Sequence, residues 1–348
     1  MTIKPDFQEK KPVFIWLLAV CVLIFCMVVL GGVTRLTSSG LSMVEWEPVM
    51  GIIPPLNETD WLQTFEKYKQ SPEYKKVNLG MDLHQFKSIF YFEYAHRVLG
   101  RVIGLAFLLP FLYFLIRRKI HWAMAPKMLI MFILGGLQGV LGWYMVKSGL
   151  VHNPHVSQYR LTAHLLAAIS IYAYILWVAM GMVWENRQNT VIAGFRRLRM
   201  AASGITTLIL IMIISGGFVA GTKAGYAFST FPLMNGQFIP DGLFSLSPWY
   251  INFFENILSI QFNHRMLAYA LFIAIPVYWF YIQKSSLQQR TKTIAHGLLL
   301  MLGIQVSLGI STLLFHMPVP LAAAHQAGAL ILLTLALLLN HELRKPST

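Results

Sequence analysis

The sequence has little charge and almost no cysteine for its length. Only 12% of its 348 residues are charged, and two are cysteines. Both of these, Cys21 and Cys26, lie inside one apolar run, so no disulfide is available to join the loops. Low-complexity segments are also missing from the loops. These absences exclude a disulfide-bonded secreted domain and argue against disordered linkers.

Long apolar runs take the place of charge. Hydrophobic residues make up 56% of the chain, and eight runs reach the roughly 20 residues that a membrane-spanning helix needs. They occupy residues 13–34, 89–116, 126–147, 160–184, 200–221, 257–282, 293–315 and 320–341. The predicted fold class is an all-α integral membrane protein with eight transmembrane helices.

The net charge of +14 is divided unevenly between the predicted loops. With the N-terminus placed inside, sixteen of the 28 Lys and Arg residues fall on inner segments against four acidic residues. The outer segments hold the other twelve against ten acidic residues. A basic excess in short loops marks the cytoplasmic side, so both termini are predicted to be cytoplasmic and nucleic-acid binding is not expected. The N-terminus lacks the features of a transit peptide or a cleaved signal, which favours a multi-pass protein of the bacterial cytoplasmic (inner) membrane.

The two halves of the chain repeat the same motifs in the same order. The matched pairs are "GGVTRLTSSG" (31–40) with "GGFVAGTKAG" (216–225), "EYAHR" (93–97) with "QFNHR" (261–265), "LQGVLG" (137–142) with "IQVSLG" (304–309), and, more loosely, "RLTAHLLAA" (160–168) with "LAAAHQAGA" (321–329). Each half contains four predicted helices, so both copies should insert in the same orientation. The sequence therefore predicts two pseudo-symmetric four-helix bundles.

The repeat divides the chain into predicted parts. These are a cytoplasmic N-terminus (1–12), an N-terminal repeat (13–184), a cytoplasmic linker (185–199), a C-terminal repeat (200–341) and a cytoplasmic tail (342–348). The N-terminal repeat includes a long outer loop, 35–88, whose Trp46 and Pro54-Pro55 segment is predicted to form a folded cap. Within it, 58–69 has the pattern of a short amphipathic helix with an acidic start.

Four of the eleven histidines share a position along the predicted helices. His96, His164, His264 and His325 each lie one to two turns from the outer end of a span, and each half contributes two of them. Zinc usually takes three or four ligands with cysteine or carboxylate help, and a di-iron site needs Glu-x-x-His twice. Haem iron takes two axial ligands and fits an apolar four-helix interior. A bis-histidine haem site in each half is the simplest interpretation.

Nearby charged residues fit the same interpretation. Arg97 and Arg265 directly follow their histidines, and Arg160 lies one turn before His164, where guanidinium groups would pair with haem propionates. Glu93 lies one turn before His96, whereas the second half has Gln261 at this position. A carboxylate can carry charge or protons and a neutral amide cannot, so the N-terminal half is predicted to be reactive and the C-terminal half to transfer electrons.

The glycines of the second and third spans are predicted to allow close helix approach. They are Gly100, Gly104, Gly135, Gly136, Gly139 and Gly142.

With "GGVTRLTSSGLSMVEW", "EYAHRVLGR", "YRLTAH", "FNHRMLAY" and "AAAHQAG", the chain resembles the haem A synthase family over nearly its whole length. The resemblance implies oxidation of the C8 methyl group of haem O to the formyl group of haem A by successive hydroxylation. It further implies that His264 and His325 ligate a resident haem b, and that His96 and His164 flank the substrate haem with Glu93 nearby. Some family members have a cysteine pair in the first outer loop; this chain resembles the alphaproteobacterial and mitochondrial branch without it.

Other functions remain as alternatives. The main one is a di-haem b electron-transfer subunit that converts no substrate; a transporter and a haem-holding assembly factor for a terminal oxidase are two more. For the synthase, the expected partners are membrane lipid and haem O delivered by a haem O synthase. The sequence does not specify the electron-transfer partner, and it is compatible with a homo-oligomer.

Overall fold

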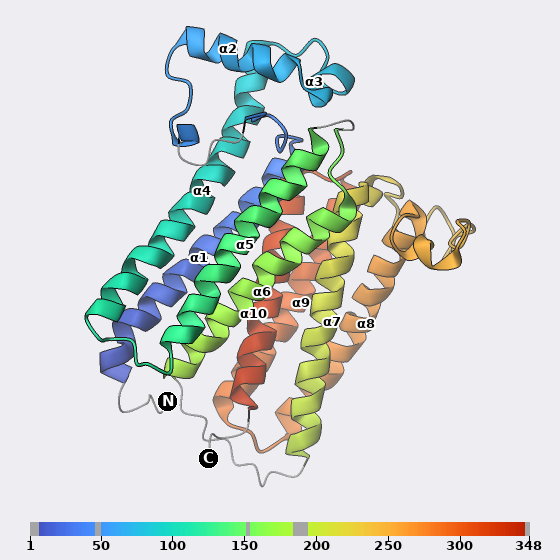
Figure 1. The fold of residues 1–348 in the computed structure, drawn as a ribbon. Helices are drawn as coiled ribbons and strands as arrows, with labels where there is room; N and C mark the ends of the chain where they lie inside the picture. The colour runs from blue at the N-terminus through green and yellow to red at the C-terminus, as the bar shows by residue number, and fades with distance from the viewer. Residues whose placement is uncertain (1–6, 46–49, 151–153, 184–193, 345–348) are drawn as a thin grey trace. The chain divides into compact units, whose positions relative to one another are not determined.

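The computed structural model describes residues 7–45, 50–150, 154–183 and 194–344 (Figure 1). Within these ranges the secondary structure is helical, apart from one isolated β-bridge between Met234 and Gln237. Several features of the sequence prediction lie outside the described residues. They are Trp46, His152, most of the linker 185–199 and the outermost residues of both ends of the chain.

Eight helices are long and apolar enough to cross a membrane, which confirms the predicted fold class. They are α1 (Phe7–Leu36), α4 (Leu83–Ile116), α5 (Ala125–Gly149), α6 (Gln158–Val183), α7 (Phe195–Thr222), α8 (Ile257–Lys284), α9 (Gln289–Leu314) and α10 (Val319–Glu342). Each coincides with one of the eight apolar runs and extends it by a few residues. The cytoplasmic placement of the termini stays a prediction.

The helices form two compact units that divide within α1 and α6. The first unit is Ala19–Ile171, and the second unit combines Met1–Leu18 with Tyr172–Thr348. The last part of α6 belongs to the second unit because it packs on α10. There Tyr172 Oη and Thr334 Oγ1 share a hydrogen bond of 2.8 Å, and the Trp177 ring meets the His341 ring edge-on at 5.2 Å. The predicted repeat boundaries at residues 184 and 200 stay predictions.

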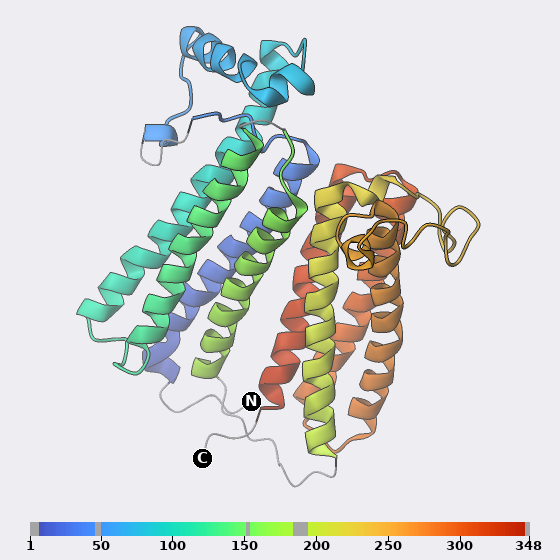
Figure 2. The same cartoon turned by 45° about the vertical axis from the view of Figure 1, so that its right-hand side comes forward.

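In the second unit, α7, α8, α9 and α10 form a closed ring in which each helix packs on its two neighbours (Figure 2). Polar side chains add to the apolar packing between α7 and α10. Asn340 donates to Thr206 Oγ1 at 2.6 Å and to the Ala202 carbonyl at 3.1 Å. The loop between α7 and α8 contains the short helices η2 (Ala224–Tyr226) and η3 (Trp249–Phe253).

The long helices of the first unit are spaced more widely. Among the described residues, α4 and α5 are the only two of them whose backbones approach closely over several residues. The glycines of α4 and α5 are predicted to allow close helix approach, and this prediction is wrong for four of the six. At Gly104, Gly135, Gly136 and Gly139 an added methyl group would meet no atom within 4 Å, whereas Gly100 lies against Met27 and Gly142 against His164.

A cap of short helices covers the beginning of α4. The cap is the described part of residues 37–82. It includes the short helices η1 (Met50–Ile52), α2 (Glu58–Lys69) and α3 (Pro72–Lys76) (Figure 1). The predicted helix at 58–69 is confirmed, and its aromatic residues lie one turn apart on the buried face. They join two aromatic residues of α4 in one cluster, which contains Trp61, Phe65, Tyr68, Phe86 and Phe90. Helix α4 begins six residues before the predicted span, at a capping box formed by Asp82 and Gln85, and these extra turns carry the cap.

Candidate functional site

In the first unit, the predicted histidines of α4 and α6 each lie against a glycine of a neighbouring helix. A methyl group on Gly31 of α1 would lie 3.0 Å from His96 Nε2, and one on Gly142 of α5 would lie 2.9 Å from His164 Cε1. His96 and His164 both belong to the first unit. The structure thus brings this pair together inside the first unit.

The second unit repeats this arrangement. A methyl group on Gly216 of α7 would lie 3.4 Å from His264 Cε1, and one on Gly309 of α9 would lie 2.8 Å from His325 Cε1. His264 and His325 both belong to the second unit. Each unit therefore holds two imidazoles from two helices, and each imidazole lies against a glycine of one of the other two helices. We call these four glycines, Gly31, Gly142, Gly216 and Gly309, the glycine seats.

Glutamine side chains fix the helix turns that carry two of these histidines. Gln138 Nε2 donates to the His164 carbonyl at 2.8 Å, and Gln305 Nε2 donates to the His325 carbonyl at 2.9 Å. Nδ1 of each of these imidazoles is buried without a hydrogen-bond partner among the described residues. An unpaired buried ring nitrogen is unfavourable unless something else occupies the site.

One contact differs between the two units. His264 Nδ1 shares a hydrogen bond of 3.2 Å with Ser215 Oγ, next to the glycine seat. With the proton on Nδ1, the serine accepts this bond and Nε2 is left as the metal-binding atom. The matching residue beside Gly31 in the first unit is Leu30, which offers no such bond.

Glu93 is buried and ties α4 to the chain that follows α1. Its Oε2 accepts bonds of 2.8 Å from the Ser42 hydroxyl and the Met43 backbone N–H. Its Oε1 accepts a bond of 2.6 Å from Arg97. Arg97 donates in turn to the Met43 carbonyl at 2.8 Å and to the Glu45 carbonyl at 3.0 Å. The structure therefore joins Glu93 and Arg97 to the start of the cap.

The second unit has a version of the same anchor without the carboxylate. Gln261 Nε2 and Arg265 Nη2 both donate to the Phe228 carbonyl, at 2.9 Å and 3.2 Å. Phe228 is 185 residues after Met43, the same separation as between the glycine seats Gly31 and Gly216. The two loops are thus held at equivalent positions of the repeat, by a charged pair in one unit and by Gln and Arg in the other.

The three predicted arginines have different surroundings. Arg265 is buried, and its Nε and Nη1 have no hydrogen-bond partner among the described residues. Arg160 donates to Tyr144 Oη at 3.1 Å and stacks on its ring. Arg97 is engaged as described above. Arg265 is therefore the one with buried donors still able to receive an anion.

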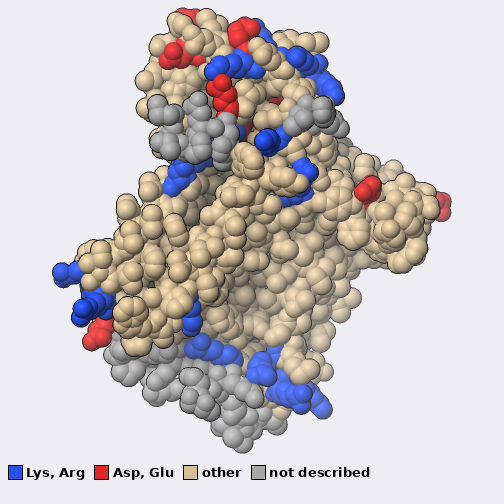
Figure 3. Space-filling model, in the orientation of Figure 1, with Lys and Arg blue, Asp and Glu red and all other residues tan. Residues whose placement is uncertain are grey.

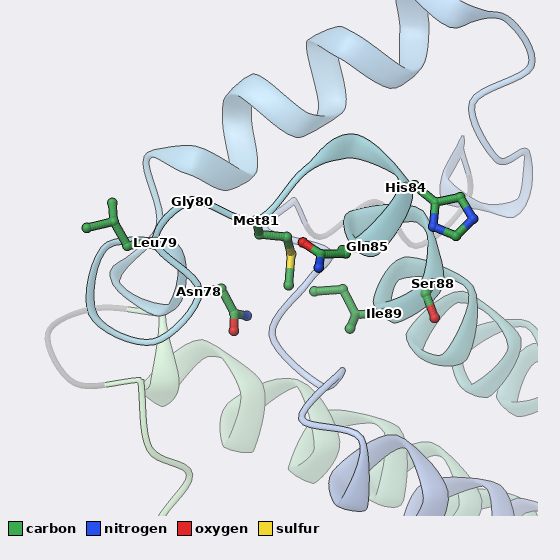
Figure 4. Close-up of a pocket in the computed structure, with 8 residues that line it drawn as sticks. All are labelled: Asn78, Leu79, Gly80, Met81, His84, Gln85, Ser88 and Ile89. Carbon is green, nitrogen blue, oxygen red and sulfur yellow. The ribbon is translucent and has the colours of Figure 1, made fainter.

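The cap has a shallow pocket of its own. It measures 620 Å³ and is formed by the loop after α3 and the first turns of α4, including Asn78, His84 and Ile89 (Figure 4). None of the four paired histidines lines it. The pocket is separate from the histidine sites, and among the described residues no group of three or more His, Cys, Asp or Glu side chains forms a metal site.

Several residues of the site were missed by the sequence interpretation. They are the glycine seats, the paired glutamines, Ser215 and the cap residues Ser42 and Met43. The signal was present for some of them, because Gly31/Gly216, Gln138/Gln305 and Gly142/Gly309 are identical pairs inside the repeated motifs. Apart from Gly142, which is predicted to allow close helix approach, the sequence interpretation uses these residues only as markers of the repeat.

Comparison with known proteins confirms the resemblance. A curated "Heme A synthase" from Nitrosospira multiformis is 55% identical over 97% of this chain and 95% of its own length. One from Nitrosomonas eutropha is 51% identical over 95% and 93%. "Heme A synthase COX15" from Arabidopsis thaliana is 47% identical over 98% of this chain and 76% of its own length. The family model COX15-CtaA, described as cytochrome oxidase assembly protein, matches residues 14–337. The chain belongs to this family of cytochrome oxidase assembly proteins.

Proposed function

We propose that this protein is a haem A synthase that oxidises the C8 methyl group of haem O, through the alcohol, to the formyl group of haem A for terminal oxidases. The observation that carries the proposal is the repeated seat, in which two facing histidines lie against two glycines in each unit. Two imidazoles on facing helices match the two axial positions of haem iron. The similarity to curated haem A synthases supports the reaction.

The second unit is the proposed site of a resident haem b, ligated by His264 and His325. The residues fit such a group, because Ser215 orients His264 and the unpaired donors of Arg265 suit a propionate carboxylate. When bound, haem b would supply one-electron transfer. The close packing of all four helices around this pair suits a group that does not leave.

The first unit is the proposed substrate site, with haem O between His96 and His164. Its helices are spaced more widely, and His96 lacks the serine partner that His264 has. A lipophilic substrate with a farnesyl tail would enter between such helices from the bilayer. Arg160 is the proposed propionate partner here, since Arg97 is engaged by the cap.

We assign Glu93 to this reactive site. All three of its partners donate to it, so its carboxylate acts as an acceptor that fixes the start of the cap over the helix carrying His96. Buried one turn from that ligand, the carboxylate would also stabilise positive charge that develops at the methyl carbon during oxidation.

The similarity of the two sites also favours a second candidate, a di-haem b electron-transfer subunit. Extraction of the pigments from purified protein separates the two functions. A synthase contains haem O or haem A beside haem b, whereas an electron-transfer subunit contains haem b alone.

Substitution of the ligands assigns the two sites. His264→Met or His325→Met should remove the low-spin haem b spectrum, and His96→Met should leave it while stopping conversion of haem O. An unchanged haem b spectrum in both His264→Met and His325→Met would overturn the assignment.

We further propose the bacterial cytoplasmic membrane as the location and a haem O synthase as the source of the substrate. Homologous bacterial sequences and eight apolar helices support a multi-pass membrane protein.

A further inference from the structure

The loop between α7 and α8 exposes its aromatic residues. Residues 223–256 include nine aromatic and only three charged residues, Lys223, Asp241 and Glu255. Trp249 is 66% exposed, Phe244 63% and Tyr250 54%. The loop forms an almost uncharged protrusion in Figure 3, at the place where Figure 1 draws it. A soluble surface rarely presents so many large apolar side chains together.

The loop is nonetheless well ordered by polar groups in its interior. Asn252 is fully buried and donates to the Leu246 and Trp249 carbonyls, both at 2.8 Å. It also accepts bonds of 3.0 Å from the Leu246 N–H and from Asn256. Around η3, a polar side chain thus lies inside the loop and apolar rings lie outside. This is the reverse of the arrangement favoured in water, and it suits surroundings that offer few hydrogen bonds.

The exposed rings form one cluster next to a membrane span. This cluster, called here the η3 cluster, consists of Phe244, Trp249, Tyr250 and Phe253. Trp249 lies 6.0 Å from Phe253 and 6.3 Å from Tyr250 between ring centroids, and Phe244 lies 6.1 Å from Phe253. Helix α8 begins at Ile257, four residues after η3, and Ile257 itself is exposed. The apolar surface of the span therefore continues into the cluster.

The cap of the first unit differs from this loop, because the aromatic side chains of its helix α2 are buried. Residues 37–82 contain eleven charged residues, and the Trp, Phe and Tyr rings of α2 are buried against α4. The two loops occupy equivalent positions of the repeat, but the aromatic rings of α2 are buried in the cap whereas those around η3 are exposed. This contrast indicates different surroundings, water for the cap and an apolar medium for the loop of the second unit.

We propose that the η3 cluster is inserted in the boundary between headgroups and acyl chains of the leaflet at which α7 ends and α8 begins. Trp and Tyr favour this depth because their rings are apolar and their N–H and O–H groups still reach water or headgroups. The scarcity of charge in the loop agrees with lipid as the occupant, since a charged protein partner would be met by complementary charges.

Collision accessibility of nitroxide labels in lipid nanodiscs tests the proposal. Cys21→Ala and Cys26→Ala remove the natural thiols, and single cysteines are then introduced by Trp249→Cys or Tyr250→Cys. Two matched positions calibrate the scale. Leu79, 77% exposed, lies in the charged cap, and Ile273, 65% exposed, lies in the middle of α8. The ratio of accessibility to oxygen over a water-soluble nickel chelate rises with depth in the bilayer.

We expect labels at 249 and 250 to give ratios above that at 79 and below that at 273. A ratio equal to that at 79 would place the cluster in water and overturn the proposal. Low accessibility to both reagents would show that protein covers the cluster, as in a contact between two copies, and would also overturn it. Because neither site of haem binding is altered, the result does not depend on the proposed function.

Discussion

Each of the four paired histidines faces a residue that has no side chain, and the steric reason can be tested one residue at a time. The ring of His325 lies only 2.8 Å from where the Cβ atom of any other residue at position 309 would be, which is too close for a side chain. Gly303, on the same helix, has nothing within 4 Å of an added methyl group. The two glycines are thus a matched pair that differs only in what they face.

Gly309→Ala should displace the His325 ring and weaken binding of haem b. Disturbing the orientation of a metal ligand typically lowers metal affinity by about 10- to 100-fold. We expect the dissociation constant of haem b to rise by this factor, measured as loss of the low-spin spectrum when the protein is diluted. Gly303→Ala should bind haem as the unaltered protein does. Equal haem retention in the two variants would show that the glycine seat does not set the position of the histidine.

The hydrogen bond from His264 Nδ1 to Ser215 predicts a smaller, electronic effect. Ser215→Ala removes the acceptor for His264 Nδ1, so the imidazole should become a weaker electron donor and the reduction potential of haem b should rise. The affinity for haem b should fall by about 10-fold, the lower end of the range for groups that hydrogen-bond to a metal ligand. Ser215→Thr keeps the hydroxyl and should restore both values. A potential that is the same in Ser215→Ala and in Ser215→Thr would contradict this role.

At the scale of elements, the sequence predicted the helices well and some of their ends poorly. Residues 58–69 were predicted as a helix and form α2 with these bounds, because acidic residues begin it and aromatic residues recur on one face. Helix α3 was missed, although Ser71 caps it and Pro72 occupies its first turn. Five residues are too few for a periodic pattern. The early start of α4 was also missed, since hydropathy reports the apolar span and not the two turns that pack on the cap.

The cap contains a buried carboxylate whose titration should change its stability. Glu73 accepts a hydrogen bond of 3.2 Å from Tyr68 Oη, and Asn78 donates to the same hydroxyl at 2.7 Å. Burial raises the pKa of Glu73 from 4.5 to about 7, and the negative charge of Glu93 adds to this shift. The folded cap therefore holds the Glu73 proton more tightly than the unfolded segment does.

We expect the cap to become less stable as the pH rises from about 4.5 to about 7, and to change little above that range. The shift corresponds to about 3 kcal/mol at most. Hydrogen exchange of the α2–α3 peptides, converted to protection factors to remove the intrinsic effect of pH, measures the change. Glu73→Gln cannot titrate and should remove this dependence. A cap with the same protection at pH 5 and pH 8 in the unaltered protein would contradict the prediction.

At the scale of the whole molecule, the sequence repeat predicted which residues correspond but not how they are used. The structure places His96 and His164 in the first unit and His264 and His325 in the second, and their use as haem ligands stays a prediction. The contacts of Glu93 and Arg97 with Ser42 and Met43 could not be predicted, because they depend on the path of the chain after α1. The sequence likewise could not predict that four of the glycines contact no neighbouring helix, because a glycine in a span fits the same pattern whether it faces another helix or not.

The two halves share a framework of paired histidines that lie against glycines, and two replacements within this framework distinguish them. Ser215 replaces Leu30 beside a glycine seat, and Gln261 replaces Glu93 in the loop anchor. The helices of the second unit also pack more closely. Together these differences give the second unit closer helix packing, a hydrogen-bonded His264 and a loop anchor without a carboxylate. This division agrees with one resident haem and one haem that must enter, react and leave.

Glu93→Gln gives the first unit the side chain that the second unit already has. The amide oxygen can still accept from Ser42 and Met43, but the ion pair with Arg97 is lost. Haem b should remain bound, because Gln261, Arg265 and Phe228 are unchanged. We expect turnover to fall by about 10²-fold, the lower end of the effect of a positioned charge in catalysis, and haem O or its hydroxylated form to accumulate.

Two further variants separate charge from anchoring in this prediction. Glu93→Asp keeps the charge but withdraws it, and it should retain more activity than Glu93→Gln. Ser42→Ala removes one anchoring bond without touching the charge, and its effect on turnover should be smaller still. If Glu93→Gln converts haem O as fast as the unaltered protein, the carboxylate serves only to hold the cap. The reactive site would then have to be identified by the wider helix spacing and the missing serine alone.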